Sequence, residues 1–232
     1  NGTFEIGDGT YAGSGIIATQ TLSAALFVDG PASIPVRGRI IDKNGGFTDY
    51  NATITVNNVA PTAVLANGGL VIQGNNGSVS FSGQSDPSSV DTSAGFHYAY
   101  DFDNNGTFEV GDGTYVGSGT STSATVPASF LATSGAHIVK ARIIDKDGGF
   151  TDYTTTINVG NVPPVIAVDV ATVTVNEGQT ATNSGTASDA GGGAVTVSPS
   201  IGSTSGSSLW SWSFVTNDGP GQTQTVTVTA TD

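Results

Sequence analysis

Two phrases of this 232-residue chain occur twice, and this duplication constrains the fold more than any other feature. The opening phrase, NGTFEIGDGTYAGSG, returns from Asn105 with 13 of its 15 residues unchanged. The phrase IIDKNGGFTDY, which begins at Ile40, returns from Ile143 with one change. The offsets are 104 and 103 residues, and a period of about 100 residues is the size of one whole domain. We therefore expect similar domains arranged in series.

Composition predicts an all-β chain. Runs rich in Val and Thr are broken about every ten residues by Gly, Asn, Asp or Pro, and no stretch with a helical period is long enough to compete. The phrases NNVAPTAV and GNVPPVIAV, from Asn57 and Gly160, predict short, stiff joints because proline fixes φ and restricts the preceding residue. The predicted domains are residues 1–60, 61–163 and 164–232.

The second predicted domain is the complete one. Residues 62–104, which precede the phrase at Asn105, are predicted to form strands, whereas nothing precedes Asn1. We therefore expect the first domain to be the C-terminal part of a sandwich and the chain to be an excerpt from a longer one. The third domain starts in register with the second, since SGQSD from Ser82 and GTASD from Gly185 lie 103 residues apart. It then diverges, and we expect it to lack its last strand.

One long stretch carries a family resemblance. SDPSSVDTSAGFHYAYDFDNNGTFEVGDG from Ser85, followed by ARIIDKDGGFTDYTTTINV from Ala141, resembles the polycystic kidney disease (PKD) domains of large bacterial surface and secreted proteins. The family's usual core is Tyr-X-Trp-Asp-Phe-Gly-Asp-Gly, and Tyr100 replaces its Trp before a longer, more acidic turn. The resemblance covers the second domain fully and the first in part, while the third looks like a related immunoglobulin-like module. It implies tandem seven-stranded, immunoglobulin-like β-sandwiches that serve as spacer, stalk or adhesive module, are extracellular, and sometimes hold calcium.

Two aromatic patterns predict how the cores are filled. In FHYAYDFD the aromatics, among them Tyr98 and Tyr100, alternate with other residues, so one strand face is predicted to be core and the other to end in two carboxylates. LWSWSF places Trp210, Trp212 and Phe214 on one face of another strand. Such a row fills a core or stacks on sugar rings. We favour the core, because the third domain otherwise lacks large side chains.

The acidic loop after the first aromatic pattern has the oxygen-ligand spacing of a calcium loop. A glycine at its sixth place would allow the sharp backbone turn, but its twelfth residue is Asp rather than the usual Glu, and it joins strands rather than helices. The alternative is a polar turn that needs no metal. The candidate ligands are Asp101, Asp103, Asn105, Glu109 and Asp112.

Two further acidic groups are candidates for calcium. The turn DKDGGFTD could equally be a Gly-Gly hairpin without metal. The other group lies near the first joint, in the manner of an interdomain calcium site, although Asp86 could instead cap the turn that Pro87 begins. The candidates are Asp145 and Asp147 with Asp152 in the turn, and Asp86 with Asp91 and Asn58 near the joint.

The charge balance excludes several classes of partner. With 19 acidic residues against 6 Lys and Arg, the net charge is −13, which disfavours nucleic acid and anionic bilayers and suits divalent cations. No apolar run approaches the roughly 20 residues that span a bilayer, so we expect no membrane insertion in this segment. Cys is absent, only two His occur, and no nucleophile motif is present, so we expect no enzyme.

The repetition favours a mechanical role. Our leading hypothesis is a non-catalytic spacer, stalk or fibre segment of a long extracellular or cell-surface protein, bacterial by its resemblance, with Ca²⁺ as the candidate stiffening ion. Its partners would be neighbouring domains or copies of the same protein. The alternatives are an adhesion module that binds surface polysaccharide or protein, a strand-exchanged filament subunit, and an accessory domain of a secreted hydrolase.

Overall fold

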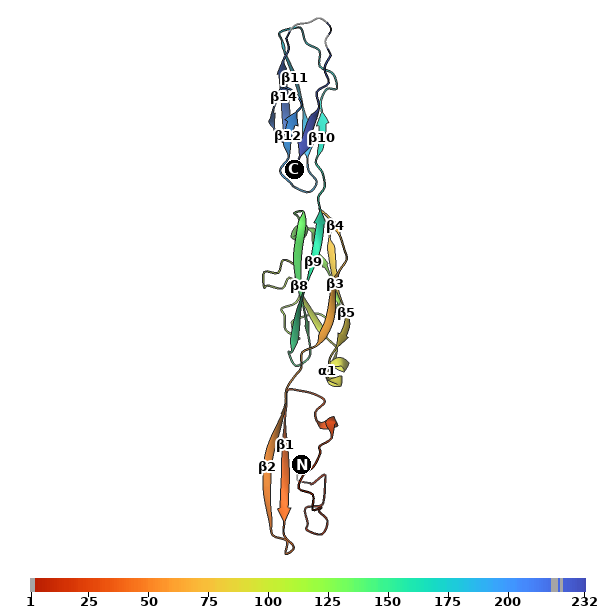
Figure 1. Ribbon diagram of the computed structural model, residues 1–232, viewed down its shortest axis with the longest axis vertical. Coiled ribbons are helices and arrows are strands. Elements are labelled where there is room, and N and C mark those ends of the chain that lie inside the picture. The colour runs from red at the N-terminus through yellow and green to blue at the C-terminus, as the bar shows by residue number, and fades with distance from the viewer. Residues whose placement is uncertain (1–2, 218–220, 222) are drawn as a thin grey trace.

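The computed structural model describes residues 3–217, 221 and 223–232, and it shows three groups of strands in single file (Figure 1). The fold is all-β, as the composition predicts, with one short α-helix and two 3₁₀ turns in the described residues. Short stretches without regular structure separate the groups. We call the groups the N-terminal unit (residues 3–56), the middle unit (62–160) and the C-terminal unit (165–231), separated by the first joint (57–61) and the second joint (161–164).

The N-terminal unit is built around one antiparallel hairpin. Its elements are η1 (Ala24–Leu26), β1 (Ala32–Ile41) and β2 (Phe47–Val56). The turn between the strands closes on Asp42, whose Oδ1 accepts hydrogen bonds from the backbone N–H groups of Asn44 and Gly46. Ile40 is 68% exposed on this hairpin, so one of its faces is apolar and uncovered by the described residues.

The middle unit is a two-layer sandwich of seven strands (Figure 1). One sheet has the order β3-β5-β7 and the other β4-β9-β8-β6. This is an immunoglobulin-like β-sandwich with the number of strands that the resemblance implies. Its elements are β3 (Thr62–Asn67), β4 (Val71–Ile72), β5 (Gly77–Ser85), α1 (Ser89–Ala94), β6 (His97–Asp101), β7 (Ser123–Val126), η2 (Ala128–Leu131), β8 (Gly135–Ile144) and β9 (Phe150–Gly160).

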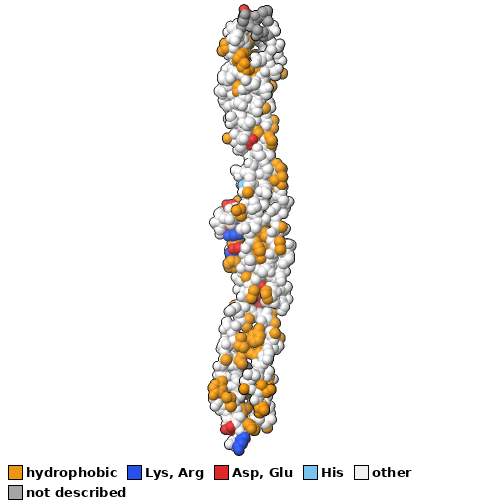
Figure 2. Space-filling view, viewed as in Figure 1, with side chains coloured by type: hydrophobic (Ala, Val, Ile, Leu, Met, Phe, Trp, Pro, Cys, Tyr) orange, Lys and Arg blue, Asp and Glu red, His pale blue; other side chains and the backbone are white. Residues whose placement is uncertain are grey.

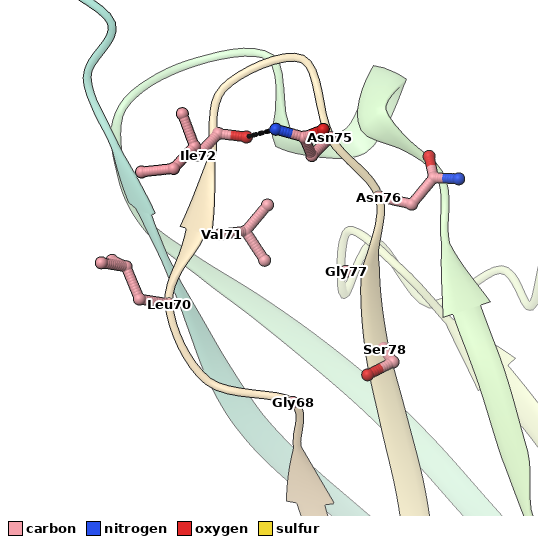
Figure 3. A pocket seen from close by; sticks show the side chains of 8 residues that line it. All are labelled: Gly68, Leu70, Val71, Ile72, Asn75, Asn76, Gly77 and Ser78. Atoms are coloured by element: carbon pink, nitrogen blue, oxygen red, sulfur yellow. Dashed lines mark hydrogen bonds between the residues drawn. The ribbon is translucent and has the colours of Figure 1, made fainter.

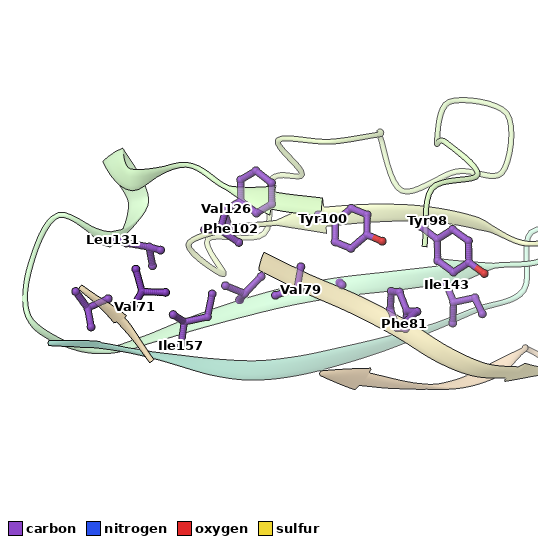
Figure 4. Packing of buried hydrophobic residues seen from close by; sticks show 13 residues of the cluster. Val71, Val79, Phe81, Tyr98, Tyr100, Phe102, Val126, Leu131, Ile143 and Ile157 are labelled. Carbon is purple, nitrogen blue, oxygen red and sulfur yellow. The ribbon is translucent and has the colours of Figure 1, made fainter. Parts of the chain in front are cut away.

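The core of the middle unit confirms the aromatic alternation. Tyr98 and Tyr100 of β6 are 4% and 1% exposed, and their ring centroids lie 5.3 and 6.2 Å from that of Phe81 on the facing sheet (Figure 4). The opposite face of β6 is buried as well, because Ala99 and Asp101 are fully buried. The loop after β6 folds back over this face: a Cβ built on Gly111, which has φ +76°, would lie 3.2 Å from the Ala99 Cβ. The predicted polar face is therefore covered at Ala99 and Asp101, whereas Asp103, its second carboxylate, is exposed.

The C-terminal unit is a second sandwich with its own core. Its strands form the sheets β10-β11-β14-β13 and β12-β15. Trp210 and Trp212 of β14 are 2% and 7% exposed, and the Trp212 indole donates a hydrogen bond to the Ile201 carbonyl. The core interpretation of these tryptophans is confirmed, and neither ring is available to stack on a sugar. The strands are β10 (Val165–Val168), β11 (Thr180–Ser188), β12 (Thr196–Pro199), β13 (Ser203–Gly206), β14 (Leu209–Val215) and β15 (Val228–Thr231).

Candidate metal centre

Three carboxylates from separate parts of the sequence meet at the end of the middle unit that faces the N-terminal unit. Asp86 follows β5, Asp91 lies in α1, and Asp145 follows β8. Helix α1 marks this end of the unit in Figure 1. One oxygen from each side chain lies within 4.8 Å of the others. We call Asp86, Asp91 and Asp145 the joint carboxylates.

Local turn chemistry holds the first two joint carboxylates in place. The Asp86 Oδ1 accepts a 2.7 Å hydrogen bond from the Ser88 backbone N–H, as expected for a residue that caps the turn beginning at Pro87. The Ser88 Oγ in turn accepts a 3.1 Å hydrogen bond from the Asp91 backbone N–H and caps α1. The sequence SDPSSVD thus forms a turn and a short helix that bury the Asp91 side chain.

The third joint carboxylate closes a hairpin and contacts the first joint. The Asp145 Oδ1 accepts hydrogen bonds from the backbone N–H groups of Asp147 and Gly149, at 2.9 and 2.8 Å. Its Oδ2 accepts a 2.9 Å hydrogen bond from the Asn58 side-chain amide. The acidic turn and the acidic joint, which the sequence offers as two separate candidate groups, are therefore one site.

Three oxygens of this site are buried without a hydrogen-bond partner in the part of the chain that the structure describes. They are the Oδ2 of Asp86 and both carboxylate oxygens of Asp91, a side chain with no exposed surface. Burial raises the pKa of Asp91 because it disfavours the charged form. Two like charges about 4 Å apart repel by about 4 kcal/mol at the effective dielectric of a partly buried site. A bound cation would remove both costs.

Lys146 neutralises an outer group of carboxylates that shares Asp91. Its Nζ lies 2.9 Å from the Asp29 Oδ2 and 3.4 Å from the Asp91 Oδ1, and it also donates to the Asp147 Oδ2. The hydrogen bonds to Asp147 and Asp29 raise the pKa of Lys146, and the bond to Lys146 lowers the pKa of Asp29. The outer group therefore has an ammonium ion of its own. Asp91 is thus shared between this outer group and the joint carboxylates.

The joint carboxylates fit a calcium ion. Calcium takes six to eight oxygens at about 2.3–2.6 Å, so two of its ligands lie at most about 5 Å apart. The spacing of the joint carboxylates meets this limit. Rotation of the Asn58 amide by half a turn would present its carbonyl oxygen where its NH₂ group now meets Asp145. Asp86, Asp91, Asp145 and Asn58 would then supply four or five oxygens, and water or backbone carbonyls the rest.

The predicted calcium loop is also a carboxylate cluster, but five of its six carboxylate oxygens accept hydrogen bonds from nearby amides. Ligand oxygens of Asp101, Asp103 and Glu109 lie within 4.8 Å of one another. Lys140 Nζ is 3.4 Å from the Asp101 Oδ2. These contacts favour the alternative in which the loop is a polar turn held by its own amides. The backbone N–H of Phe102 donates to Glu109, and that of Gly106 donates to Asp101. The backbone N–H of Asn105 donates to both Asp101 and Asp103, and its side-chain Nδ2 donates to Asp103.

Asp112 and Asn105 direct their oxygens away from this cluster. The Asp112 Oδ1 accepts hydrogen bonds from the backbone N–H and hydroxyl of Thr114, at 2.8 and 2.7 Å. This bond to Thr114 lowers the pKa of Asp112. The first copy of the phrase repeats the arrangement with Asp8 and Thr10. The Asn105 Oδ1 accepts a hydrogen bond from the Thr107 backbone N–H.

The last acidic residue of the turn DKDGGFTD serves a cation–aromatic cluster. Asp152 binds Arg142 through two hydrogen bonds of 2.7 and 2.9 Å, and the guanidinium lies 3.5 Å from the ring centroid of Phe150. The first copy repeats the paired charges as Arg39 and Asp49. Asp152 is thus separate from the joint carboxylates.

Sequence reasoning missed Asp29 and Lys146, which complete the electrostatics of the joint. Asp29 lies 58 residues before Pro87 and 117 before Lys146, so no local spacing connects these groups. The two copies of the repeat differ at this position: the residue 103 positions after Asp29 is Ala132. The copy that lies next to the acidic joint therefore has an acid where the other copy has an alanine.

The surface offers little enclosed space. A crevice of about 340 Å³ on the middle unit is lined by glycine, aliphatic, serine and asparagine residues, none of which titrates near neutral pH (Figure 3). A second crevice, of about 110 Å³, lies at the first joint and includes Asp29 and Asp86. Hydrophobic side chains are scattered over all three units on the face shown in Figure 2. Among the described residues, no helix has the length and apolarity needed to cross a membrane.

No family model matches the chain, and no curated protein matches it. A chimeric titin Z1Z2 functionalized with a KLER exogenous peptide from decorin is 16% identical, with a TM-score of 0.29 over 75% of this chain and 90% of the other. The titin domains Z1Z2 in complex with telethonin are 15% identical, with a TM-score of 0.36 over 76% and 91%. Domains 4 and 5 of the S-layer protein SbsC are 17% identical, with a TM-score of 0.27 over 74% and 94%.

Similarities at this level carry no argument about function. The fold class stated above rests on the strands and sheets of the chain itself. The immunoglobulin-like sandwich is thus observed, whereas membership of the PKD family stays a prediction.

Proposed function

We propose that this chain is a non-catalytic structural segment, a spacer or stalk, of a long extracellular repeat protein, bacterial by its resemblance to PKD repeats. The observation that carries the proposal is the single file of sandwich units connected by short joints that contain proline (Figure 1). Such an array holds its two ends far apart, and each proline restricts one backbone φ angle in a joint.

The placement of the polar side chains supports a role without catalysis. His97 stacks on Tyr115 with ring centroids 3.9 Å apart, and the His137 Nε2 lies 2.8 Å from the Thr133 carbonyl oxygen. The His137 Nε2 also lies 3.4 Å from the Thr133 hydroxyl oxygen at an exposed position, which is longer than the contact that activates a nucleophile. The acidic residues described above close turns, pair with Lys or Arg, or meet at the first joint.

We further propose that Ca²⁺ binds the joint carboxylates and stiffens the first joint. The buried carboxylate oxygens without hydrogen-bond partners support this placement over the predicted loop. The ion would connect Asn58, in the joint itself, to three elements of the middle unit. Calcium sites of extracellular modules bind at about 10⁻⁴–10⁻³ M, and a site of this kind would be filled outside a cell.

Small-angle X-ray scattering of the chain tests the proposal. In excess calcium we expect the pair-distance distribution of a rod, with a long tail toward the maximum dimension. Chelation with EGTA is expected to shorten the mean end-to-end distance, because loss of the ion removes its link between Asn58 in the first joint and the middle unit. A compact globule in calcium would contradict the spacer. A rod that EGTA leaves unchanged would contradict only the stiffening.

A second candidate function is contact with a neighbouring domain or another copy by strand addition. In the middle unit, residues 141–144 of β8 pair with β6, whereas the equivalent residues 38–41 of β1 form strand pairs only with β2 among the described residues. Large apolar side chains beside this edge are exposed, including Ile40 at 68% and Tyr50 at 60%. A free edge next to an apolar face is a template for a further strand.

Sedimentation velocity over a range of concentrations tests this second candidate. We expect the chain to self-associate as concentration rises, and we expect a double substitution, Ile40→Ser with Tyr50→Ser, to weaken the association by removing apolar contact area. The matched control is Val116→Ser, which removes a side chain that is 92% exposed on a loop of the middle unit. A monomer at every concentration would contradict the candidate.

A further inference from the structure

The second joint is held by neutral hydrogen bonds. Gln73, just after β4, is 9% exposed, and its Oε1 accepts a 3.0 Å hydrogen bond from the Val162 backbone N–H. Its Nε2 lies 3.3 Å from the Ala132 carbonyl oxygen and 3.5 Å from that of Gly191. One uncharged side chain thus contacts the middle unit, the second joint and the C-terminal unit.

The counterpart of Asp86 at the second joint is already satisfied. The residue 103 positions after Asp86 is Asp189. Its Oδ1 accepts a 2.8 Å hydrogen bond from the Gly191 backbone N–H, and its Oδ2 accepts another from the Gly193 backbone N–H. Asp189 therefore closes its own turn, and both of its oxygens have donors.

Two other acids of the first joint have neutral counterparts at the second. The residues 103 positions after Asp29 and Asp91 are Ala132 and Ala194. Alanine has no side-chain oxygen, so neither position can attract or hold a cation through its side chain. Among the described residues, the buried carboxylate oxygens that lack hydrogen-bond donors therefore lie at the first joint.

We infer that the two joints respond differently to calcium: the ion stiffens the first joint alone, and the second stays fixed through Gln73 whether or not calcium is present. This inference rests on the calcium site proposed above. Removal of calcium then weakens the first joint, which is left to the ion pair between Asp29 and Lys146 and to the hydrogen bond from Asn58 to Asp145. The middle and C-terminal units keep moving as one body. The position of the flexible point along the rod is set by where the repeat has carboxylates and where it has alanines.

Distances between spin labels across each joint test the inference in the full chain. Because the chain contains no Cys, an introduced pair of cysteines is labelled without first removing native cysteines. The substitutions Thr53→Cys and Thr154→Cys straddle the first joint, and Thr154→Cys with Ser207→Cys straddles the second. All three positions are exposed. Double electron–electron resonance gives the distance distribution of each pair in excess calcium and in EGTA.

We expect a narrow distribution across the first joint in calcium that broadens in EGTA, and a distribution across the second joint that is the same in both. Asp91→Asn is expected to make the first distribution broad under both conditions. Broadening at the second joint in EGTA, to the same degree as at the first, would overturn the inference. Calcium binding detected by calorimetry, with both distance distributions unchanged, would also overturn the inference but would leave the calcium site itself in place. No binding heat would remove the site and the inference together.

Two variants test the part assigned to Gln73. Gln73→Leu is expected to broaden the distance distribution across the second joint with and without calcium, because the Val162 N–H loses its acceptor. Gly191→Ala is the second variant, since a Cβ there would lie 2.3 Å from the Gln73 Oε1 and displace that side chain. Circular dichroism confirms that each variant keeps its strands. A second distribution that stays narrow in both folded variants would contradict the role of Gln73.

Discussion

Saturating calcium is expected to raise the melting temperature of the middle unit by about 10 °C or more, and Asp91→Asn is expected to abolish the rise. A ligand at a hundred times its dissociation constant stabilises the folded state by about 2.7 kcal/mol, and each kcal/mol shifts the melting of a domain of about 100 residues by about 4–8 °C. Asp91 has both oxygens unpaired by hydrogen bonds and no exposed surface, so it is the ligand whose loss matters most. Scanning calorimetry in excess calcium and in EGTA measures the shift.

The same substitution is expected to act in the opposite direction once calcium is removed. In EGTA, Asp91→Asn replaces a buried charge by a neutral amide and relieves its repulsion from Asp86 and Asp145. Lys146 keeps Asp29 and Asp147 as partners. The variant should therefore melt above the unsubstituted chain in EGTA and below it in calcium. A variant that melts lower under both conditions would show that Asp91 has a packing role and binds no ion.

The predicted calcium loop supplies the matched control. Asp103→Asn removes an exposed carboxylate whose two oxygens accept hydrogen bonds from Asn105. We expect this variant to keep the full calcium-dependent rise in melting temperature. If Asp103→Asn abolished the rise and Asp91→Asn did not, the ion would belong to the loop.

The fold could be predicted largely from patterns that are local in sequence. A period of two places Tyr98 and Tyr100 on one face of a strand wherever that strand lies, and both are core residues. The burial of Asp101 on the opposite face could not be predicted this way, because it depends on a later loop folding back over β6. The six-residue helix α1 was also missed, although the Ser88 cap with Asp91 three residues later resembles the start of a capping box.

The candidate site shows the same division between local and tertiary information. The loop from Asp101 to Asp112 has the ligand spacing of a calcium loop, yet its carboxylates are used by backbone amides. The joint carboxylates come from two segments, up to 59 residues apart, and only the sandwich brings the ends of β5 and β8 together. Spacing along the chain therefore identified Asp86 and Asp145 as candidates but could not show that they share one site.

The repeat also provides an internal control for the largest effect we expect on stability. Ile143→Ala is expected to destabilise the middle unit by about 2–5 kcal/mol, because the side chain is fully buried and its truncation leaves a cavity. Ile40 is the same residue in the first copy, 103 positions earlier and 68% exposed. Ile40→Ala is expected to change stability by no more than about 0.5 kcal/mol. Urea unfolding followed by circular dichroism measures both.

Tryptophan fluorescence extends this experiment to the division into domains, because both tryptophans lie in the core of the C-terminal unit. If the units fold independently, Ile143→Ala shifts the unfolding seen by circular dichroism and leaves the fluorescence transition of Trp210 and Trp212 in place. A fluorescence transition that moves with Ile143→Ala would mean that the second joint couples the stabilities of its neighbours. If Ile40→Ala lowered the free energy of unfolding as much as Ile143→Ala does, the hairpin face would be packed against another surface in solution. Independent transitions together with a stiff second joint would show that Gln73 fixes orientation without linking the two folding equilibria, which is what a rod made of separate domains requires.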